Sequence, residues 1–195
     1  MKNVVIKGEL RTDLGKKGTK GVRANGLIPC VIYGGENPIH FAVPVSAVRD
    51  IVYTPDFKIA QIEIEGKSYK TILKSYQTHP VTDAIEHIDF LRLVEGHPVK
   101  VELPVRFYGV SPGVKVGGKL LQTLRKIKVK TTPQYLRDEI LMDISAMELG
   151  QSIRVRDIQG IEGIEIMSSP GIPVATIEIP RALRSAAAAA EKGKK

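Results

Sequence analysis

Cysteine is almost absent from this sequence, since Cys30 is the only one in 195 residues. A single thiol can form neither an intramolecular disulfide framework nor a cysteine-based zinc site, so the chain suits a reducing compartment. Tryptophan is absent, and aromatic residues make up only 5% of the chain. No apolar run approaches about 18 residues, which argues against a transmembrane helix, and the N-terminus has no signal-peptide pattern. A cytoplasmic protein without membrane contact is therefore expected.

Acidic residues are also relatively few. The chain has 21 Asp and Glu against 29 Lys and Arg, a net charge of +8 and a pI near 9.5. This balance fits a polyanionic partner, because basic side chains that neutralise phosphates release condensed counterions. Composition alone fits a scattered, solvated surface charge equally well. Hydrophobic residues make up 43%, enough for a packed core, and the length suits two domains of about 100 residues each.

Hydrophobic periodicity is mostly two, which predicts a mainly β protein with short helices. Residues 28–33 form an apolar run closed by two glycines, and residues 58–64 and 68–73 flank a hairpin turn. Residues 43–52 place their apolar side chains on one helical face. In the second half, strands are expected at 99–108, 120–130, 140–144, 153–155, 164–167 and 174–179. The predicted domains are residues 1–93 and 94–182, followed by a flexible Ala- and Lys-rich tail at 183–195.

Residues 11–26 combine basic side chains with glycines. The first 30 residues contain seven basic and two acidic side chains, and within residues 11–26 four glycines interrupt the basic ones. Glycine lets the backbone approach a phosphate closely, while Lys and Arg supply charge. The segment therefore predicts a basic glycine-rich loop in contact with RNA. The alternative is a flexible solvated loop.

Residues 113–119, GVKVGGK, match the first seven positions of a phosphate-binding P-loop. The eighth position should be a Ser or Thr that ligates magnesium, but it is Leu120, and strand-like residues follow instead of a helix. A β-hairpin loop is the favoured interpretation. A nucleotide-binding enzyme is the rival one.

The four histidines show no metal-ligand spacing, so no metal or cofactor is expected. His87 and Asp89 share one face of a predicted strand, while Ile88 and Phe90 share the other. A His–Asp pair is typical of a catalytic triad, but no nucleophile-elbow serine is present, and Cys30 lies in an apolar strand. The alternative is a polar face that recognises RNA.

Three lysines at 126, 128 and 130 also share one face of a predicted strand. Such a strip is either solvated or forms a second contact with RNA or protein.

Several short motifs follow one another in a characteristic order along the chain. They are Arg11, Gly15-Lys16, Lys20, Arg23, residues 26–34, His79-Pro80 and residues 87–90. This order resembles the bacterial large-subunit ribosomal protein family that binds 5S ribosomal RNA, in its long two-domain form called the Ctc or general-stress type. The second half matches through Leu136, residues 138–140, residues 143–145 and Leu149-Gly150.

The resemblance implies an N-terminal β-barrel related to the anticodon-binding domain of glutaminyl-tRNA synthetase, followed by a second all-β domain. It implies a non-enzymatic component of the large ribosomal subunit, with no small-molecule substrate. The implied partners are 5S rRNA for the first domain and other rRNA or ribosomal proteins for the second. The alternative is a stress-induced, substoichiometric ribosome-associated protein or protein-interaction module. By position, the implied RNA contacts are Arg11, Lys16, Lys20, Arg23, Tyr33, Gln77, His79, His87 and Asp89.

Overall fold

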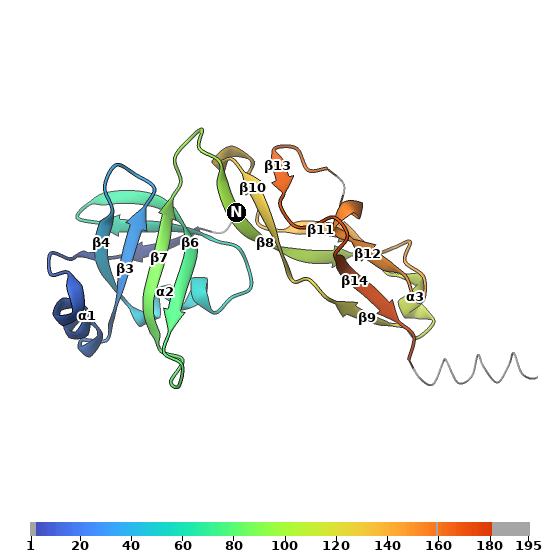
Figure 1. Cartoon of the computed structure of the whole chain (residues 1–195), viewed down its shortest axis with the longest axis horizontal. Coiled ribbons are helices and arrows are strands. Elements are labelled where there is room, and N and C mark those ends of the chain that lie inside the picture. Colours follow the sequence, from blue (N-terminus) through green and yellow to red (C-terminus); the bar gives the residue numbers. More distant parts are fainter. Residues whose placement is uncertain (1–2, 159, 181–195) are drawn as a thin grey trace, which may run out of the picture. The chain divides into compact units, whose positions relative to one another are not determined.

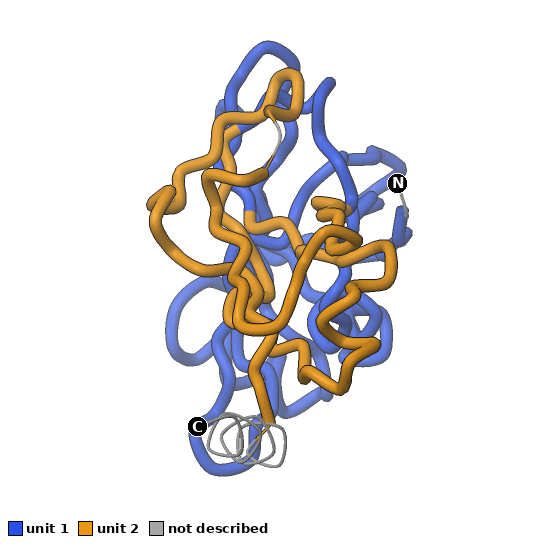
Figure 2. Tube along the Cα trace, turned by 90° about the vertical axis from the view of Figure 1, so that its right-hand side faces the viewer, with its two compact units in different colours: residues 1–101, 131–138 blue, residues 102–130, 139–195 orange. Residues whose placement is uncertain are grey.

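The structure, a computed structural model, describes residues 3–158 and 160–180; the predicted tail at 183–195 lies outside the described residues. The chain forms two compact units, coloured separately in Figure 2. Unit 1 contains residues 1–101 and 131–138, and unit 2 contains residues 102–130 and 139–195. Both units are built mainly from β-strands, which confirms the predicted fold class.

Unit 1 is built around a curled seven-stranded sheet with the order β1-β5-β6-β7-β3-β4-β2 (Figure 1). Its strands are β1 (Asn3–Lys7), β2 (Glu9–Leu10), β3 (Leu27–Tyr33), β4 (Ile39–Pro44), β5 (Ile59–Ile64), β6 (Lys67–Thr78) and β7 (Ile85–Arg92). Its helices are α1 (Gly15–Ala24), α2 (Val45–Val52) and the short 3-10 helix η1 (Pro133–Tyr135). The predicted short helix in residues 43–52 is thus present as α2.

Gly8 lets the N-terminal segment reach both edges of this sheet. On one side of it β1 pairs in parallel with β5, and on the other side β2 pairs antiparallel with β4. The Gly8 N–H donates to the Glu63 carbonyl at 2.9 Å. A Cβ on Gly8 would lie 2.6 Å from the Phe41 ring, so only glycine lets the backbone pass the core here. The two edges are therefore linked by one continuous segment, in keeping with the predicted N-terminal barrel.

The core of unit 1 follows from strand alternation. Ile28, Cys30 and Ile32 on β3 point inward and are almost fully buried, as are Ile88 and Phe90 on β7. Each fully buried large apolar side chain contributes roughly 1.5–3 kcal/mol relative to an exposed one. This packing fixes which side chains of β3 and β7 point outward.

The predicted glycine-rich loop at residues 11–26 is wrong for its central part, because residues 15–24 form α1. Glycine costs about 1 kcal/mol relative to alanine in a helix interior, so the composition pointed away from a helix. Packing outweighs this cost at Gly18, where a Cβ would lie 2.6 Å from the Asp13 carbonyl oxygen. The helix ends at Asn25, and Gly26 adopts φ +73°, the left-handed conformation typical of the residue after a helix.

Unit 2 contains two small sheets, with the orders β11-β8-β10-β13 and β12-β14-β9. Their strands are β8 (Val99–Tyr108), β9 (Lys119–Gln122), β10 (Lys126–Thr131), β11 (Ile140–Asp143), β12 (Ser152–Arg154), β13 (Ile164–Ile166) and β14 (Pro173–Glu178). The helices are α3 (Pro112–Lys115) and the 3-10 helix η2 (Val155–Asp157). The predicted strand at 120–130 is divided into β9 and β10, because Thr123 and Leu124 both donate to the Val174 carbonyl between them.

The P-loop-like segment 113–119 is not the predicted hairpin loop. It begins inside α3, which Ser111 caps by accepting from the Val114 N–H, and continues into β9. A Cβ on Gly113 would lie 2.7 Å from the Glu148 backbone, and one on Gly118 would lie 2.6 Å from the Gly113 oxygen. The glycines are therefore required for close packing within unit 2, which explains the motif without a bound nucleotide.

Candidate nucleic-acid interface

The outward face of the sheet in unit 1 carries a row of mostly polar side chains. In the ladder, Asp89 on β7 is opposite Val31 on β3 and Ser75 on β6, and Val31 is opposite His40 on β4. Registered partners share a sheet face, and the neighbouring pair of Cys30 and Ile88 points into the core. The row from Ser75 to His40 therefore faces outward across four strands.

A second row on the same face places Gln77 on β6 opposite His87 on β7. Tyr33 on β3 is opposite Leu91, two residues after Asp89 and on the same side of the strand. Four of the predicted RNA contacts thus lie on one sheet face: Tyr33, Gln77, His87 and Asp89. We call this the polar sheet face; it also includes Ser75 and His40.

Asp89 is held by two neighbours on this face. The Ser75 hydroxyl donates to Asp89 Oδ2 at 2.6 Å, and His87 Nδ1 lies 3.0 Å from Asp89 Oδ1. The side chains of His87 and Asp89 are each 28% exposed, so both remain open to a ligand. Half-buried polar groups with fixed partners keep a defined geometry, which base recognition requires. The pair predicted from strand alternation is therefore present.

Tyr33 stays a neutral hydroxyl on this face. Partial burial, and secondarily the negative charge of Asp89, raises the pKa of Tyr33 above its ordinary value. The phenol is consequently a hydrogen-bond donor throughout the physiological range.

Helix α1 carries the basic part of the candidate interface. Lys16, Lys20 and Arg23 are spaced i, i+4 and i+7, which places them along one face of the helix. Lys16 and Lys20 are exposed and form no salt bridge within the described ranges 3–158 and 160–180. Their charge is therefore free for a polyanion.

Arg23 ties this helix to the polar sheet face. Its Nε and Nη2 donate to the Glu86 carbonyl oxygen at 3.2 and 3.0 Å. Glu86 immediately precedes His87 on β7, and α1 also packs beside β3 (Figure 1). The guanidinium fork thus fixes the basic helix next to the His–Asp pair.

Arg11 lies on the other side of α1, beside an open groove of about 660 Å³. Its backbone N–H donates to the His40 carbonyl at 2.9 Å, and Nη2 donates to the Asp13 carbonyl at 3.1 Å. Its Nε is buried without a hydrogen-bond partner in the described part of the chain. Arg11 is therefore anchored beside His40, at the margin of the polar sheet face.

His79 lies just outside the strand ladder that carries Gln77, His87 and Asp89. It lies at the end of the β6–β7 hairpin, where Nδ1 accepts from the Val81 and Thr82 N–H groups, both at 3.3 Å. The His79 N–H also donates to the Ala84 carbonyl at 2.8 Å. Its imidazole thus organises the turn through Nδ1, and only the other ring nitrogen is left for a ligand.

Two members of the polar sheet face were missed in the sequence, namely Ser75 and His40. The ladder shifts register between Leu73 and Ser75, because Lys74 is an extra residue in β6. Leu73 therefore faces the core opposite Phe90, whereas Ser75 faces outward, although strict alternation places both on one side. No local sequence signal identifies a bulge at this lysine.

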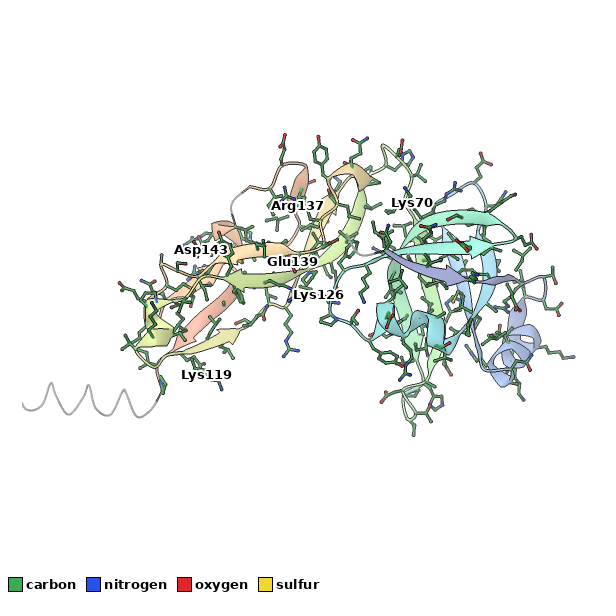
Figure 3. The ribbon with its side chains drawn as sticks, turned by 180° about the vertical axis from the view of Figure 1, so that it is seen from behind. Lys70, Lys119, Lys126, Arg137, Glu139 and Asp143 are labelled. Atoms are coloured by element: carbon green, nitrogen blue, oxygen red, sulfur yellow. The ribbon has the colours of Figure 1, made fainter. Side chains whose placement is uncertain are left out.

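The lysine strip of unit 2 is largely paired within that unit. Lys128 Nζ lies 3.7 Å from Glu102, and Lys130 Nζ lies 3.3 Å from Glu165. Lys126 on β10 and Lys119 on β9 are exposed (Figure 3). Exposed ion pairs of this kind contribute about 0–1 kcal/mol each, so they do not explain the fold. They do reduce the charge that the strip offers to a polyanion.

Other chemistry finds no support in the described residues. In the ranges 3–158 and 160–180, no group of three or more His, Cys, Asp or Glu side chains is arranged to hold a metal ion. Within the same ranges, no helix has the length and hydropathy needed to cross a membrane.

The fold defines the chain as a two-unit, mainly β protein with a polar sheet face beside a basic helix. Residues 6–90 match the family model described as the Ribosomal L25p family, and residues 98–181 match the model for the C-terminal domain of ribosomal protein TL5. The chain therefore belongs to the ribosomal L25p family, in the long form with a TL5-type C-terminal domain. The resemblance in the sequence is thereby confirmed.

Curated relatives match over almost their full lengths. The large ribosomal subunit protein bL25 of Cytophaga hutchinsonii is 45% identical over 192 residues, which cover 98% of this chain and 100% of the relative. The bL25 proteins of Phocaeicola vulgatus and Amoebophilus asiaticus are each 41% identical, over 98% and 100% of this chain and 100% of each relative. Membership in a family of ribosomal proteins confirms a non-enzymatic, structural class and a cytoplasmic, ribosomal location.

Proposed function

We propose that the chain is a structural component of the large ribosomal subunit that binds 5S rRNA through its N-terminal domain, residues 1–93. The observation that carries the proposal is the convergence of His87, Asp89, Gln77 and Tyr33 on the polar sheet face, with α1 tied beside them by Arg23. Membership in the ribosomal L25p family supports it.

The two parts of the interface have different roles in this proposal. Lys16 and Lys20 on α1 contact phosphates, which supply affinity with little sequence choice. The polar sheet face lies against the shallow minor groove of an irregular RNA helix, where base edges and 2′-hydroxyls are accessible. Asp89 accepts hydrogen bonds from base amino groups, because a carboxylate cannot approach phosphate favourably.

For unit 2 we propose a buttressing role, in which the C-terminal domain contacts neighbouring rRNA or ribosomal proteins. Its exposed lysines Lys119 and Lys126, which form no salt bridge within residues 3–158 and 160–180, support a weak polyanion contact (Figure 3). The paired state of Lys128 and Lys130 argues against the whole strip as an RNA surface.

Binding of the full-length chain to 5S rRNA and to a regular RNA duplex tests the proposal. Asp89→Ala should reduce the preference for 5S rRNA by roughly 5- to 150-fold, about 1–3 kcal/mol, and leave duplex affinity nearly unchanged. Glu102→Ala in unit 2 is a matched control and should preserve the preference. Equal losses on both RNAs would contradict base recognition by Asp89, and no preference of the unaltered chain for 5S rRNA would refute the proposed function.

A further inference from the structure

Ser75, Asp89 and His87 form a continuous hydrogen-bonded chain on the polar sheet face. The Ser75 hydroxyl engages Asp89 Oδ2 at 2.6 Å, and His87 Nδ1 engages Asp89 Oδ1 at 3.0 Å. Ser75 comes from β6, while the other two come from β7. Each carboxylate oxygen therefore has its own neighbour, and the carboxylate plane is fixed between them.

The direction of these hydrogen bonds follows from the groups. An ionised carboxylate only accepts, so the Ser75 hydrogen and a hydrogen on His87 Nδ1 must both point at Asp89. In the neutral imidazole, a hydrogen on Nδ1 leaves Nε2 with a free lone pair. The second nitrogen of His87 is then a hydrogen-bond acceptor, whereas the other tautomer would make it a donor.

We propose that Ser75 is a positioning residue: by holding Asp89, it keeps His87 in the Nδ1–H tautomer and presents Nε2 as an acceptor to an N–H or O–H donor of the RNA. The inference rests on the proposed function and defines the chemical group that this part of the interface recognises. In the minor groove, the available donors are the guanine 2-amino group and the ribose 2′-hydroxyl.

The fold itself does not require the Ser75 hydroxyl. Ser75 is exposed, and its backbone pairing with β7 is available to any residue. The bulge at Lys74 turns Ser75 toward Asp89, whereas the preceding Leu73 packs into the core. A serine serving only as a solvated strand residue would not need a 2.6 Å bond to a carboxylate.

The imidazole nitrogen-15 spectrum of the free, full-length chain tests the first half of the inference. Under conditions where His87 is neutral, the unaltered chain should show a protonated Nδ1 and an unprotonated Nε2. Ser75→Ala should shift the population toward the Nε2–H tautomer, and Ser75→Thr should restore the original spectrum. An Nε2–H tautomer in the unaltered chain, or a Ser75→Ala spectrum without change, would overturn the proposal.

Binding to 5S rRNA tests the second half. Ser75→Ala should weaken binding by roughly 2- to 12-fold, and Ser75→Thr should stay within about twofold. Ser68→Ala, an exposed serine on the same strand, is the matched control and should bind normally. In an Asp89→Asn background, Ser75→Ala should add no further loss, because Ser75 acts through the carboxylate. An additive loss in that background would refute the positioning role.

Modified RNA identifies the donor. Guanine-to-inosine substitution removes the 2-amino group, and 2′-deoxy substitution removes the ribose hydroxyl. At the nucleotide that His87 contacts, one of these two substitutions should abolish the difference in RNA affinity between the unaltered chain and Ser75→Ala. If neither does, the acceptor role of Nε2 is wrong. A failure of the unaltered chain to bind 5S rRNA would instead refute the proposed function, and the spectrum of the free chain would still decide the tautomer.

Discussion

Cys30 shows what burial does to a single reactive group. It lies on β3 with its side chain fully buried, and burial raises the pKa of its thiol well above the usual range. The nearby Arg11 lowers the pKa in part, and Asp89 raises it further. A thiol that stays protonated is a poor nucleophile, so Cys30 is an inert core residue.

Cys30 should therefore not react with a disulfide reagent at pH 8 until the chain unfolds. Above about pH 8.5 the unfolded thiol loses its proton while the native thiol keeps it. Since the folded pKa is raised, the free energy of unfolding should fall by about 1.4 kcal/mol per pH unit above that point. Urea denaturation of the unaltered chain and of Cys30→Ala at pH 7 and pH 10 isolates this loss. If the difference in free energy of unfolding between the two proteins is the same at both pH values, the expectation is contradicted.

Arg23 was predicted as an RNA contact, and the structure gives its side chain a further role. Arg23→Ala removes both hydrogen bonds to the Glu86 carbonyl, so α1 should open more easily by about 0.5–1.5 kcal/mol. Amide hydrogen exchange in residues 15–24 should accelerate, and binding should weaken on all RNAs alike. Arg23→Lys should behave similarly, because lysine lacks the planar fork.

Arg49→Ala on α2 is the control for Arg23, since it removes an exposed arginine from the other α-helix of unit 1. It should leave exchange in α1 unchanged. Unaltered exchange in Arg23→Ala would show that the Glu86 contact does not hold the helix.

Single-residue features were predictable from the sequence where alternation holds. His87 and Asp89 share a face because no bulge separates them, and Cys30 is buried because its strand is apolar. Ser75 was missed because the extra Lys74 reverses the facing of the next residues. Such a bulge depends on pairing with a distant strand, which local sequence does not encode.

At the scale of elements, helix α1 is the main departure from the prediction. Its three glycines favour a loop by intrinsic propensity, but tertiary packing decides the outcome. Gly18 and Gly21 separate these two effects. A Cβ on Gly18 would meet the Asp13 carbonyl at 2.6 Å, whereas a Cβ on Gly21 would meet nothing within 4 Å.

Alanine at these two positions should have opposite effects on stability. Gly21→Ala should raise the free energy of unfolding by about 0.4–1 kcal/mol, because alanine loses less backbone entropy on folding. Gly18→Ala should lower it by about 1–3 kcal/mol, because the contacted backbone must move. Thermal and urea denaturation of both variants measures this. Stabilisation by both substitutions would show that Gly18 is not closely packed.

At the scale of the whole molecule, the net charge is +8. In the described structure, only some of the basic side chains are available to a polyanion. Lys128 and Lys130 of unit 2 lie beside carboxylates, whereas Lys16 and Lys20 on α1 form no salt bridge with any described residue. The basic composition predicted a polyanionic partner, but it did not indicate which lysines are free, because ion pairs between distant strands appear only in the folded chain. In unit 1, the lysines of α1 that form no salt bridge within the described ranges lie on the helix that Arg23 ties to the polar sheet face.

Affinity for 5S rRNA should therefore depend steeply on salt, through α1. If about six phosphates are contacted, affinity should fall roughly a thousandfold between 50 and 200 mM salt. A Lys16→Gln/Lys20→Gln variant should lower the slope of log affinity against log salt by about 1.8, because each lost phosphate contact removes about 0.9. A Lys128→Gln/Lys130→Gln variant removes equal charge from unit 2 and should keep the slope. A loss of slope in the second variant alone would place the phosphate contacts in unit 2, and a salt-independent affinity would reject the electrostatic mechanism.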